Sequence, residues 1–382
     1  MLCHVLDLEM VENTLMKDGL GEAAVERIID ALQAAGADFS AEAFRRDALS
    51  VLDRLELKDR VRHLITVMGV HLPSSFPETA YILGCIRDHW PEDDNEDDFQ
   101  IFAGWPIIDY VAEFGLNHPT IALPLLRYLT TMFSAEFAIR PFLEVHPEET
   151  YNQMLIWCLD RNDQVRRLAS EGIRPRLPWG KQLPQYIDAP GPVISLLENL
   201  KDDPSDYVRR SVANNLNDIS KDHPELVIET CKRWQADNVT ARQWIIRHAT
   251  RTLVKAGHPD VFPLLGFTNR PKLDVAKPEL STTHLILGDK LGISTHITST
   301  SEKKQYVVID YAVHYMKSNG QTAPKVFKWK NLRLKPGQSV VLKKSQPFKK
   351  ITTRRHYGGS HKIEILVNGK HASETPFELH IP

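Results

Sequence analysis

Apolar residues recur at helical spacing from about residue 10 to residue 266. In AVERIIDALQAAG (24–36) and DRVRHLITVMGVHL (59–72) they fall at positions i, i+3, i+4 and i+7, which places them on one face of an amphipathic helix. A His-Pro dipeptide recurs at positions 118, 146, 223 and 258. Because proline is well tolerated in the first helical turn, each dipeptide predicts the start of a helix.

Segments of this helical region resemble one another at a regular spacing. SAEFAIRPFL (134–143) matches LASEGIRPRL (168–177), VRRLASEGI (165–173) matches VRRSVANNL (208–216), and ARQWIIRHATRTL (241–253) continues the series. Repeats of roughly 35–45 residues built from helix pairs are typical of HEAT- or armadillo-like solenoids. We therefore expect a HEAT-like α-solenoid over residues 1–268, with a closed helical bundle as the alternative.

Beyond Phe267 the pattern changes to a period of two. Pro271 and Pro278 mark a linker, and segments such as QYVVIDYAVHYMK (305–317) and HKIEILVNG (361–369) then alternate apolar and polar residues. Turn signals such as Asn368-Gly369 separate them. About seven short strands in roughly 110 residues predict a small all-β immunoglobulin-like (Ig-like) sandwich over residues 272–382. The chain has no Cys–Trp–Cys core, so this assignment rests on strand number and length.

The net charge of −2 conceals an uneven distribution. Residues 1–130 carry 10 Lys and Arg against 23 Asp and Glu, residues 131–270 carry 18 against 18, and residues 271–382 carry 19 against 8. Such asymmetry predicts a polyanionic partner for the basic region. The alternative is an inert or partner-binding module whose lysines are simply solvated. The cations of the β-domain are chiefly Lys325, Lys328, Lys330, Lys343, Lys344, Lys349, Lys350, Arg354 and Arg355.

Several functional classes find no support in the sequence. The four cysteines lie far apart with no C-x-x-C motif, no apolar run approaches a membrane span, and the N-terminus has no basic region of a signal peptide. The motifs of zinc proteases, serine hydrolases, P-loop proteins and dinucleotide-binding proteins are also missing. We therefore expect no metal, no cofactor, no membrane partner and a cytoplasmic protein.

Three acids of the repeat region, Glu136, Glu171 and Asp218, are candidate functional residues. At about 100° per residue, each lies roughly 65–140° from the apolar stripe of its helix, always in the same rotational sense. Because successive second helices of a solenoid line one concave wall, these carboxylates can converge there. The alternative is three surface carboxylates that are solvated or paired with arginine.

Arginines recur on the same helices as the acids. A guanidinium group binds phosphate oxygens with two parallel hydrogen bonds, so arginines at repeat spacing can follow a nucleic-acid backbone. Ion pairing with acids of neighbouring repeats is the competing interpretation. The candidate DNA-binding residues are Arg166, Arg167, Arg174, Arg176, Arg209, Arg210, Arg247 and Arg251.

Trp179 follows Pro178 in RPRLPWG, just past a predicted helix end, which places it in a loop. A tryptophan in a loop is either packed against the protein as an anchor or exposed. If exposed, its flat ring can stack on a base or a sugar.

The motifs VRRLASEGIRPRLPWG (165–180) and SDYVRRSVANNLNDISKDHP (205–224) resemble those of bacterial AlkC alkylpurine DNA glycosylases. SAEFAIRPFL and ARQWIIRHATRTL extend the resemblance over residues 10–266, and the β-domain resembles the AlkC branch with a C-terminal Ig-like domain. The resemblance implies a HEAT-like repeat glycosylase that removes 3-methyladenine and 3-methylcytosine from DNA without fully flipping the lesion, unlike most base-acting enzymes. It also implies that Glu136, Glu171 and Asp218 are the catalytic acids and Trp179 the catalytic aromatic.

The implied chemistry suits these residue types. Loss of a cationic methylated base builds positive charge on the sugar, which a carboxylate stabilises, and a second carboxylate can orient the attacking water. Asp218 and Glu171 are expected in these roles, Glu136 beside the base or the water, and Trp179 against the lesion nucleotide. No lysine of these motifs demands a Schiff base, so we expect a monofunctional enzyme. We also expect it to be a monomer and to act on double-stranded DNA that contains alkylated bases. A non-catalytic HEAT-repeat scaffold that binds DNA or protein is the alternative.

Overall fold

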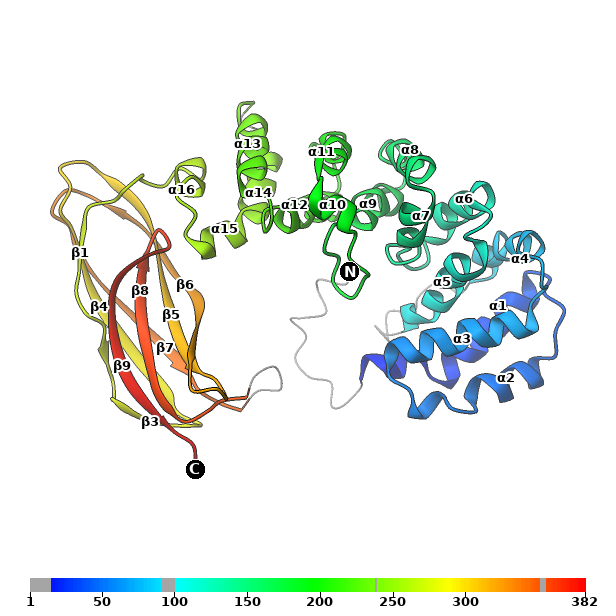
Figure 1. The fold of residues 1–382 in the computed structure, drawn as a ribbon, viewed down its shortest axis with the longest axis horizontal. Coiled ribbons are helices and arrows are strands. Elements are labelled where there is room, and N and C mark those ends of the chain that lie inside the picture. Colours follow the sequence, from blue (N-terminus) through cyan, green and yellow to red (C-terminus); the bar gives the residue numbers. More distant parts are fainter. Residues whose placement is uncertain (1–14, 91–99, 238, 351–354) are drawn as a thin grey trace. The chain divides into compact units, whose positions relative to one another are not determined.

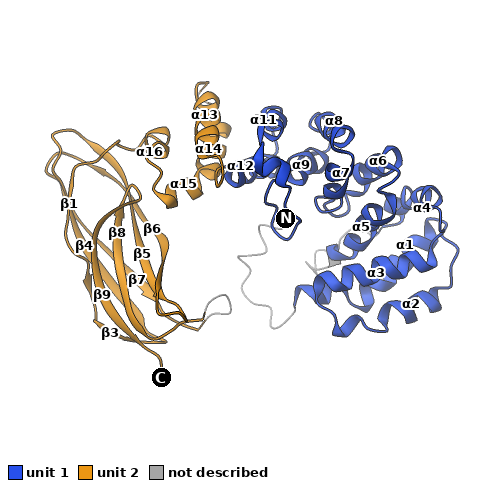
Figure 2. Cartoon of the chain, in the orientation of Figure 1, with its two compact units in different colours: residues 1–219 blue, residues 220–382 orange. Residues whose placement is uncertain are grey.

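The computed structural model describes residues 15–90, 100–237, 239–350 and 355–382. An α-helical region is followed by a strand-rich domain, so the predicted fold class is confirmed. Contacts divide the chain into two compact units, residues 1–219 and residues 220–382 (Figure 2). The last four helices group with the strands in the second unit, whereas the sequence pattern changes only between residues 268 and 272.

The first unit consists of helices α1 to α12, which follow one another along the chain (Figure 1). Short 3₁₀ turns at Met16–Leu20, Leu52–Arg54, Ile86–His89 and Gln100–Ala103 accompany them. The helices are α1 (Glu22–Ala34), α2 (Ala41–Leu49), α3 (Leu57–His71), α4 (Phe76–Leu83), α5 (Gly104–Gly115), α6 (Pro119–Leu129), α7 (Ile139–Val145), α8 (Pro147–Trp157), α9 (Asp163–Gly172), α10 (Pro184–Asp188), α11 (Gly191–Glu198) and α12 (Asp206–Ile219).

Three of the four His-Pro dipeptides begin helices as predicted. Pro119, Pro147 and Pro224 are the first residues of α6, α8 and α13 (Pro224–Gln235), where the missing N–H of proline leaves no hydrogen bond unmade. Pro259 instead lies in the turn before α16 (Val261–Leu264). The prediction that His258-Pro259 begins a helix is therefore wrong, because α16 begins two residues after Pro259.

Helices of the first unit pack mainly on their neighbours along the chain. α3 contacts α5, α5 contacts α6, α6 contacts α8, and α8 contacts α9. Helices α9 and α12 then lie side by side. Leu168 and Val212 are among the fully buried residues of this pair, and the last turns of both helices carry predicted site residues.

The second unit combines four helices with a β-sandwich. In one sheet, β1 and β2 pair with different parts of one edge of β4, and β7 pairs with its other edge. The second sheet has the order β3-β9-β8-β5-β6. All pairings are antiparallel except that of β3 with β9. The elements are α13, α14 (Thr240–Ala249), α15 (Arg251–Ala256), α16, β1 (Leu273–Val275), β2 (Glu279–Leu280), β3 (His284–Ile286), β4 (Lys290–Ser299), β5 (Gln305–Met316), β6 (Thr322–Leu334), β7 (Ser339–Pro347), β8 (Gly359–Val367) and β9 (Lys370–His380).

The helices of the second unit share a core with the sandwich. Val308 of β5 packs with Leu253, Val261 and Phe262 of α15 and α16. The side chain of Asn368, in the turn between β8 and β9, accepts a hydrogen bond from Val308 N at 2.9 Å and donates one to Thr268 O at 3.0 Å. The sandwich therefore docks directly on the last helices, and a cut between residues 268 and 272 would expose this apolar cluster.

We expect Gly369→Ala to lower the free energy of unfolding by about 3 kcal/mol. Gly369 has a φ of +69°, and an added Cβ would lie 2.1 Å from Gly257 Cα at the end of α15. Denaturant unfolding measures the loss. Gly337→Ala is the control, because Gly337 has a φ of +67° and open space around it, so only the backbone cost of about 1–2 kcal/mol applies. Equal losses in the two variants would contradict a tight helix–sandwich contact.

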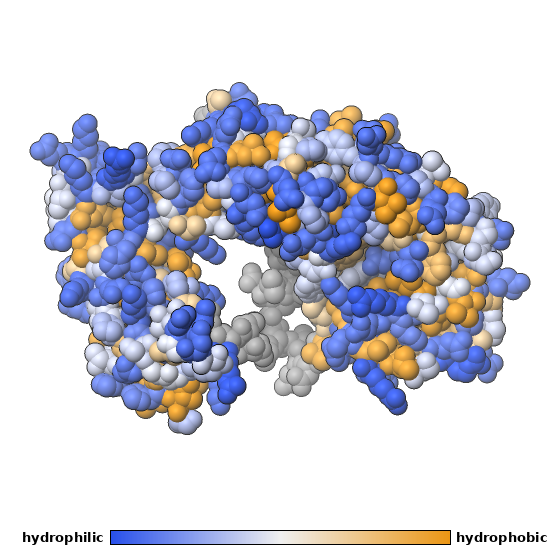
Figure 3. Space-filling model, in the orientation of Figure 1, coloured by the Kyte–Doolittle hydropathy of each residue, from blue (hydrophilic) through white to orange (hydrophobic). Residues whose placement is uncertain are grey.

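Hydrophilic residues cover most of the visible surface of each unit, and apolar residues form small separate groups on it (Figure 3). Within the described residues, none of the helices has the length and apolar character that crossing a membrane requires.

Candidate functional site

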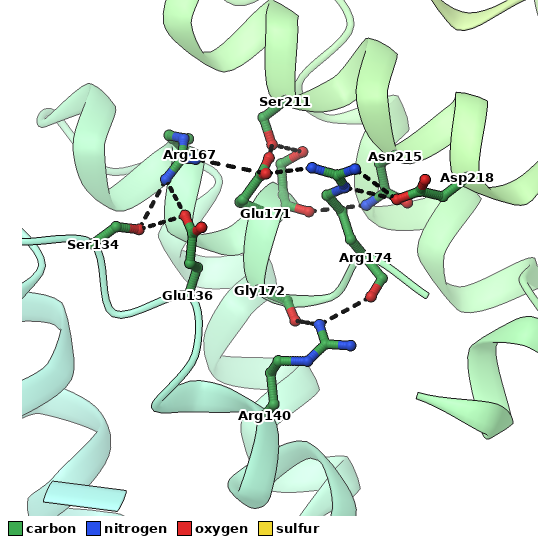
Figure 4. Close-up of polar contacts among 11 residues, drawn as sticks. Ser134, Glu136, Arg140, Arg167, Glu171, Gly172, Arg174, Ser211, Asn215 and Asp218 are labelled. Atoms are coloured by element: carbon green, nitrogen blue, oxygen red, sulfur yellow. Dashed lines mark hydrogen bonds and ion pairs between the residues drawn. The ribbon is translucent and has the colours of Figure 1, made fainter. Parts of the chain in front are cut away.

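The three predicted acids lie in one row across the first unit (Figure 4). Glu136 precedes α7, Glu171 lies in the last turn of α9, and Asp218 lies in the last turn of α12. Glu171 and Asp218 are buried, whereas Glu136 is partly exposed. The row is completed by two arginines that alternate with the acids.

Arg167 joins Glu136 to Glu171. Its Nη1 donates to Glu136 Oε2 at 2.5 Å and to Ser134 Oγ at 2.8 Å, and its Nη2 lies 3.6 Å from Glu171 Oε1. Its guanidinium carbon lies 4.7 Å from the ring centre of Tyr207, close enough for a cation–π interaction. Four residues of three chain segments thus surround one guanidinium group.

Arg174 joins Glu171 to Asp218. Its Nη1 donates to Glu171 Oε1 at 2.5 Å, and its Nε donates to Asp218 Oδ2 at 2.8 Å. The charges therefore alternate as acid, arginine, acid, arginine, acid. We call these five residues, Glu136, Arg167, Glu171, Arg174 and Asp218, the acid–arginine row.

Helix α12 supports the row through polar side chains. Ser211 Oγ lies 2.6 Å from Glu171 Oε2 and 2.8 Å from Ser170 Oγ. Since a hydroxyl has one proton, we infer that Ser211 donates to the carboxylate and accepts from Ser170. One turn further along α12, Asn215 Nδ2 donates to Ser170 O at 2.9 Å. These contacts fix the register of α12 against α9.

The charges of the row keep Glu171 ionised. Burial by itself raises the pKa of Glu171, but Arg167 and Arg174 outweigh it and hold that pKa below its ordinary value. Burial likewise opposes the charged form of Arg167, and Glu136 and Glu171 outweigh it, so the pKa of Arg167 is raised. The row consequently holds three carboxylates against two guanidinium groups, an excess of one negative charge.

Glu136 differs from Glu171 in having an oxygen with no protein partner among the described residues. Its Oε2 accepts from Ser134 and Arg167, whereas its Oε1 makes no hydrogen bond within the described part of the chain. Both oxygens of Glu171 are engaged, by Arg174 and Ser211. Of these two acids, Glu136 is the one with an oxygen open to a water or a ligand.

Four of the predicted DNA-binding arginines pair with carboxylates of the protein. Arg167 and Arg174 belong to the acid–arginine row. Arg166 makes two hydrogen bonds to Asp203, at 2.6 and 2.9 Å, and Arg209 bonds Asp206 and the carbonyl of Asp203. Arg166, Arg167 and Arg174 thus form ion pairs with acids of other segments, whereas Arg209 pairs with Asp206 of its own helix.

The other four predicted arginines differ in their surroundings. Arg176 is partly buried, and Arg251 Nη1 donates to His248 O at 2.7 Å. Arg210 on α12 is partly exposed and Arg247 on α14 is exposed. Neither of these two makes an ion pair or a side-chain hydrogen bond to any other residue that the structure describes, so both remain candidates for phosphate contacts.

Trp179 lies in the exposed loop between α9 and α10. Its relative exposure is 52%, so the residue is accessible from solvent, as the stacking interpretation requires. Gly180 N donates to Leu177 O at 3.1 Å, so Leu177-Pro178-Trp179-Gly180 forms a turn with Trp179 in its third position. The φ of Trp179 is +63°, a left-handed conformation that bulky residues rarely adopt.

The sequence interpretation missed two residues next to the row. Tyr207, whose ring lies against Arg167, belongs to the SDYVRR motif, but nothing in the sequence indicates that it contacts Arg167. Arg140 is only 1% exposed and donates to three main-chain carbonyls, those of Gly172, Arg174 and Lys181. A signal for Arg140 existed, since Arg140 and Arg174 occupy the same place in the repeated Ile-Arg-Pro motif.

Other chemistry is not evident at the site. In the described ranges, no three His, Cys, Asp or Glu side chains are grouped so that they could hold a metal ion. Cys85, Cys158 and Cys231 are free thiols, and Cys3 lies outside the described residues.

The C-terminal part of the chain matches a known family. Residues 274–381 match the model described as the C-terminal Ig-like domain of the uncharacterised protein YhaZ. Almost the whole chain is similar to YhaZ of Bacillus subtilis (strain 168), a protein described as uncharacterized. The two are 36% identical over 366 residues, which cover 95% of this chain and 99% of the relative. The predicted Ig-like domain is thus confirmed.

A solved structure is similar to the chain over both of its parts. It is the Pseudomonas fluorescens alkylpurine DNA glycosylase AlkC, bound to DNA that contains an abasic site analog. The TM-score is 0.89 at 34% sequence identity, and the match covers 96% of this chain and 100% of the other. The helical region and the strand-rich domain both fall within this match.

Proposed function

Because the chain belongs to the AlkC family of alkylpurine DNA glycosylases, we propose that it hydrolyses the N-glycosidic bond of alkylated bases in double-stranded DNA. The proposed substrates are 3-methyladenine and 3-methylcytosine, and the proposed enzyme is a monofunctional, cytoplasmic monomer with a HEAT-like repeat domain. The full-length likeness to a DNA-bound glycosylase carries this proposal, and the acid–arginine row gives it a chemistry.

The excess negative charge of the row suits this reaction. A base methylated at N3 is cationic and leaves without a strong general acid, while positive charge develops on the deoxyribose. Carboxylates held in place before the reaction stabilise that charge without reorganising, which is the main requirement for electrostatic catalysis. Glu171 meets this requirement, since Arg174 and Ser211 fix both of its oxygens and its lowered pKa keeps it charged at neutral pH.

Glu136 is the proposed ligand of the attacking water or of the departing base. Its Oε1 is open, whereas its Oε2 is held by Ser134 and Arg167. A carboxylate with one fixed and one open oxygen can orient a water molecule and accept its proton. Asp218 is proposed to share the stabilisation of the sugar cation with Glu171, and Trp179 to pack against the lesion nucleotide.

The test of this function is the incubation of the purified protein with methylated duplex DNA. We expect free 3-methyladenine and 3-methylcytosine by chromatography, and abasic sites that break only after treatment with alkali. Strand breaks without alkali would contradict the monofunctional mechanism. DNA binding with no released base would favour the non-catalytic scaffold instead.

The basic edge of the sandwich is the proposed contact with the DNA backbone. Residues 311–350 contain ten Lys and Arg and no Asp or Glu. Among the described strands, β6 pairs only with β5 and β7 only with β4, so both are edge strands, and Trp329 Nε1 of β6 reaches Lys343 O of β7 at 3.4 Å. The exposed lysines of this basic edge are Lys325, Lys328, Lys330, Lys343 and Lys344, whereas Arg354 lies outside the described residues.

We expect the simultaneous change of Lys328, Lys330 and Lys343 to Gln to lower the affinity for DNA. The same change should make the affinity less dependent on salt. The slope of log K against log salt should fall by about 0.9 for each lysine that contacts a phosphate. Fluorescence anisotropy with a labelled duplex at several salt concentrations measures the slope. The control changes Lys272, Lys303 and Lys304, which are also exposed on the same domain. Equal slopes for the two variants would reject the basic edge as the DNA contact.

A further inference from the structure

The loop that carries Trp179 has a strained tip. Its turn has proline in the second position and a φ above zero in the third, which is the pattern of a type II turn. Glycine or asparagine normally fills the third position, because a Cβ clashes there. Trp179 occupies it with an exposed ring, whereas the glycine of this turn, Gly180, stands in the fourth position. Strain of this kind persists only where the surrounding structure holds it.

Arg140 holds the base of the loop from α7. Its Nη1 donates to Gly172 O at 2.8 Å and to Arg174 O at 2.9 Å, before the tip, and its Nε donates to Lys181 O at 2.6 Å, after the tip. One buried guanidinium group thus fixes the backbone on both sides of Trp179. Burial together with the charge of Arg174 lowers the pKa of Arg140 to about 10, so it stays charged at neutral pH.

Lys58 holds the tip itself from α3. Its Nζ donates to Trp179 O at 2.5 Å, although the two residues are 121 positions apart in the sequence. A second contact with α7 lies just beyond the tip, where Lys181 Nζ lies 2.7 Å from Glu144 Oε2. The carbonyl of the strained residue is therefore bound by a side chain from another helix.

We propose that Arg140 and Lys58 are positioning residues, which hold Trp179 in its left-handed conformation at a fixed place beside the main chain of Glu171 and Arg174. Arg140 binds the carbonyl of Arg174 directly, so the backbone that carries the acid–arginine row and the backbone that carries Trp179 share one clamp. The effect of this clamp on base release rests on the proposed function, whereas its effect on the loop does not.

Lys58→Met is the first test, because Lys58 is exposed and its Nζ donates to Trp179 O. We expect the single-turnover rate of base release to fall about tenfold, since small misplacements of a substrate contact are costly. In a Trp179→Ala background the same change should have almost no effect, because a positioning residue acts only through the residue it positions. Lys201→Met, which removes an equivalent charge paired with Glu198, is the control. Equal effects of Lys58→Met in both backgrounds would overturn the proposal.

Hydrogen exchange tests the clamp without any activity. Backbone amides of residues 176–183 should exchange at least several-fold faster in Lys58→Met and in Arg140→Met than in the wild type, while those of α12 keep their protection. If Arg140→Met does not fold, Lys58→Met alone decides the outcome. Unchanged exchange of the loop in a folded variant would overturn the clamp. If the wild type releases no base but the variants exchange the loop amides faster as expected, the proposed function is rejected and the clamp is retained.

Discussion

Replacing Arg174 by methionine is expected to lower the free energy of unfolding by about 3–5 kcal/mol, because it leaves buried carboxylates without their partner. Arg174 donates to both Glu171 and Asp218, and each of these acids is at most 5% exposed. Removing one member of a buried ion pair costs far more than the pair contributes, since the remaining charge is neither solvated nor paired. Denaturant unfolding at neutral pH measures the loss.

The loss should depend on pH in a defined direction. In the wild type the pKa of Glu171 lies below its ordinary value of 4.5, so its contribution to stability is complete above that value and is lost as the pH falls through the lowered pKa. Without Arg174, its positive charge no longer stabilises ionised Glu171, so Glu171 binds a proton at a higher pH than in the wild type. The difference between the two proteins should therefore shrink as the pH falls from the pKa of Glu171 in the variant towards its lowered pKa in the wild type.

Arg62→Met provides the control for this variant. Arg62 pairs with Asp59 on the surface of α3, at 3.2 Å with both side chains largely exposed. Surface pairs of this kind contribute little, so its unfolding curve should match that of the wild type. An Arg174→Met protein as stable as the Arg62→Met protein would show that the acids of the row are not held by Arg174. Arg174→Lys should be intermediate, because an ammonium group cannot bridge two carboxylates in the geometry of a guanidinium.

The second large effect is expected from Glu171→Gln, which should lower the rate of base release by about 10²–10³. The amide has almost the shape of the carboxylate, and the Ser211 hydroxyl can turn to accept where it donated. Arg174 keeps its bond to Asp218, so the fold should survive. What is lost is a fixed negative charge where the sugar becomes positive.

Single-turnover kinetics on methylated DNA at saturating protein measures this effect, because it isolates the chemical step from product release. Asp218→Asn, tested in parallel, should show a loss of similar size. Asp206→Asn is the matched control, since Asp206 begins the same helix as Asp218 but has a largely exposed side chain. Full activity in both Glu171→Gln and Asp218→Asn would remove these acids from the mechanism.

The helical pattern placed Glu171 and Asp218 on their helices, whereas its placement of Glu136 on a helix face is wrong, because Glu136 lies in the turn before α7. Pairing of the acids with arginine was one of the sequence alternatives, but the pattern did not identify the partners. These partners are Arg167 and Arg174, which lie up to 44 positions away along the chain. Such pairing depends on the spacing between successive helix layers, which the periodicity of a single helix does not contain.

Local rules explain where the prediction of the fold held and where it was incomplete. Proline at position 119, 147 or 224 acts through its own ring and begins a helix, and Asn368-Gly369 forms the predicted tight turn, with φ values of +46° and +69°. The docking of Val308 on α15 and α16 is a long-range contact. No pattern near residue 308 distinguishes it from a contact within the sandwich.

The acid–arginine row also limits how this chain can change over generations. Each of its contacts joins residues of two different helical layers, from Glu136 through Arg167, Glu171 and Arg174 to Asp218. An insertion or deletion of a whole layer between residues 136 and 218, which repeat architectures otherwise tolerate well, would leave a charged side chain facing no partner. This stretch should therefore be inherited as a block of nearly constant length, whereas additional layers can be gained or lost only before it or after it.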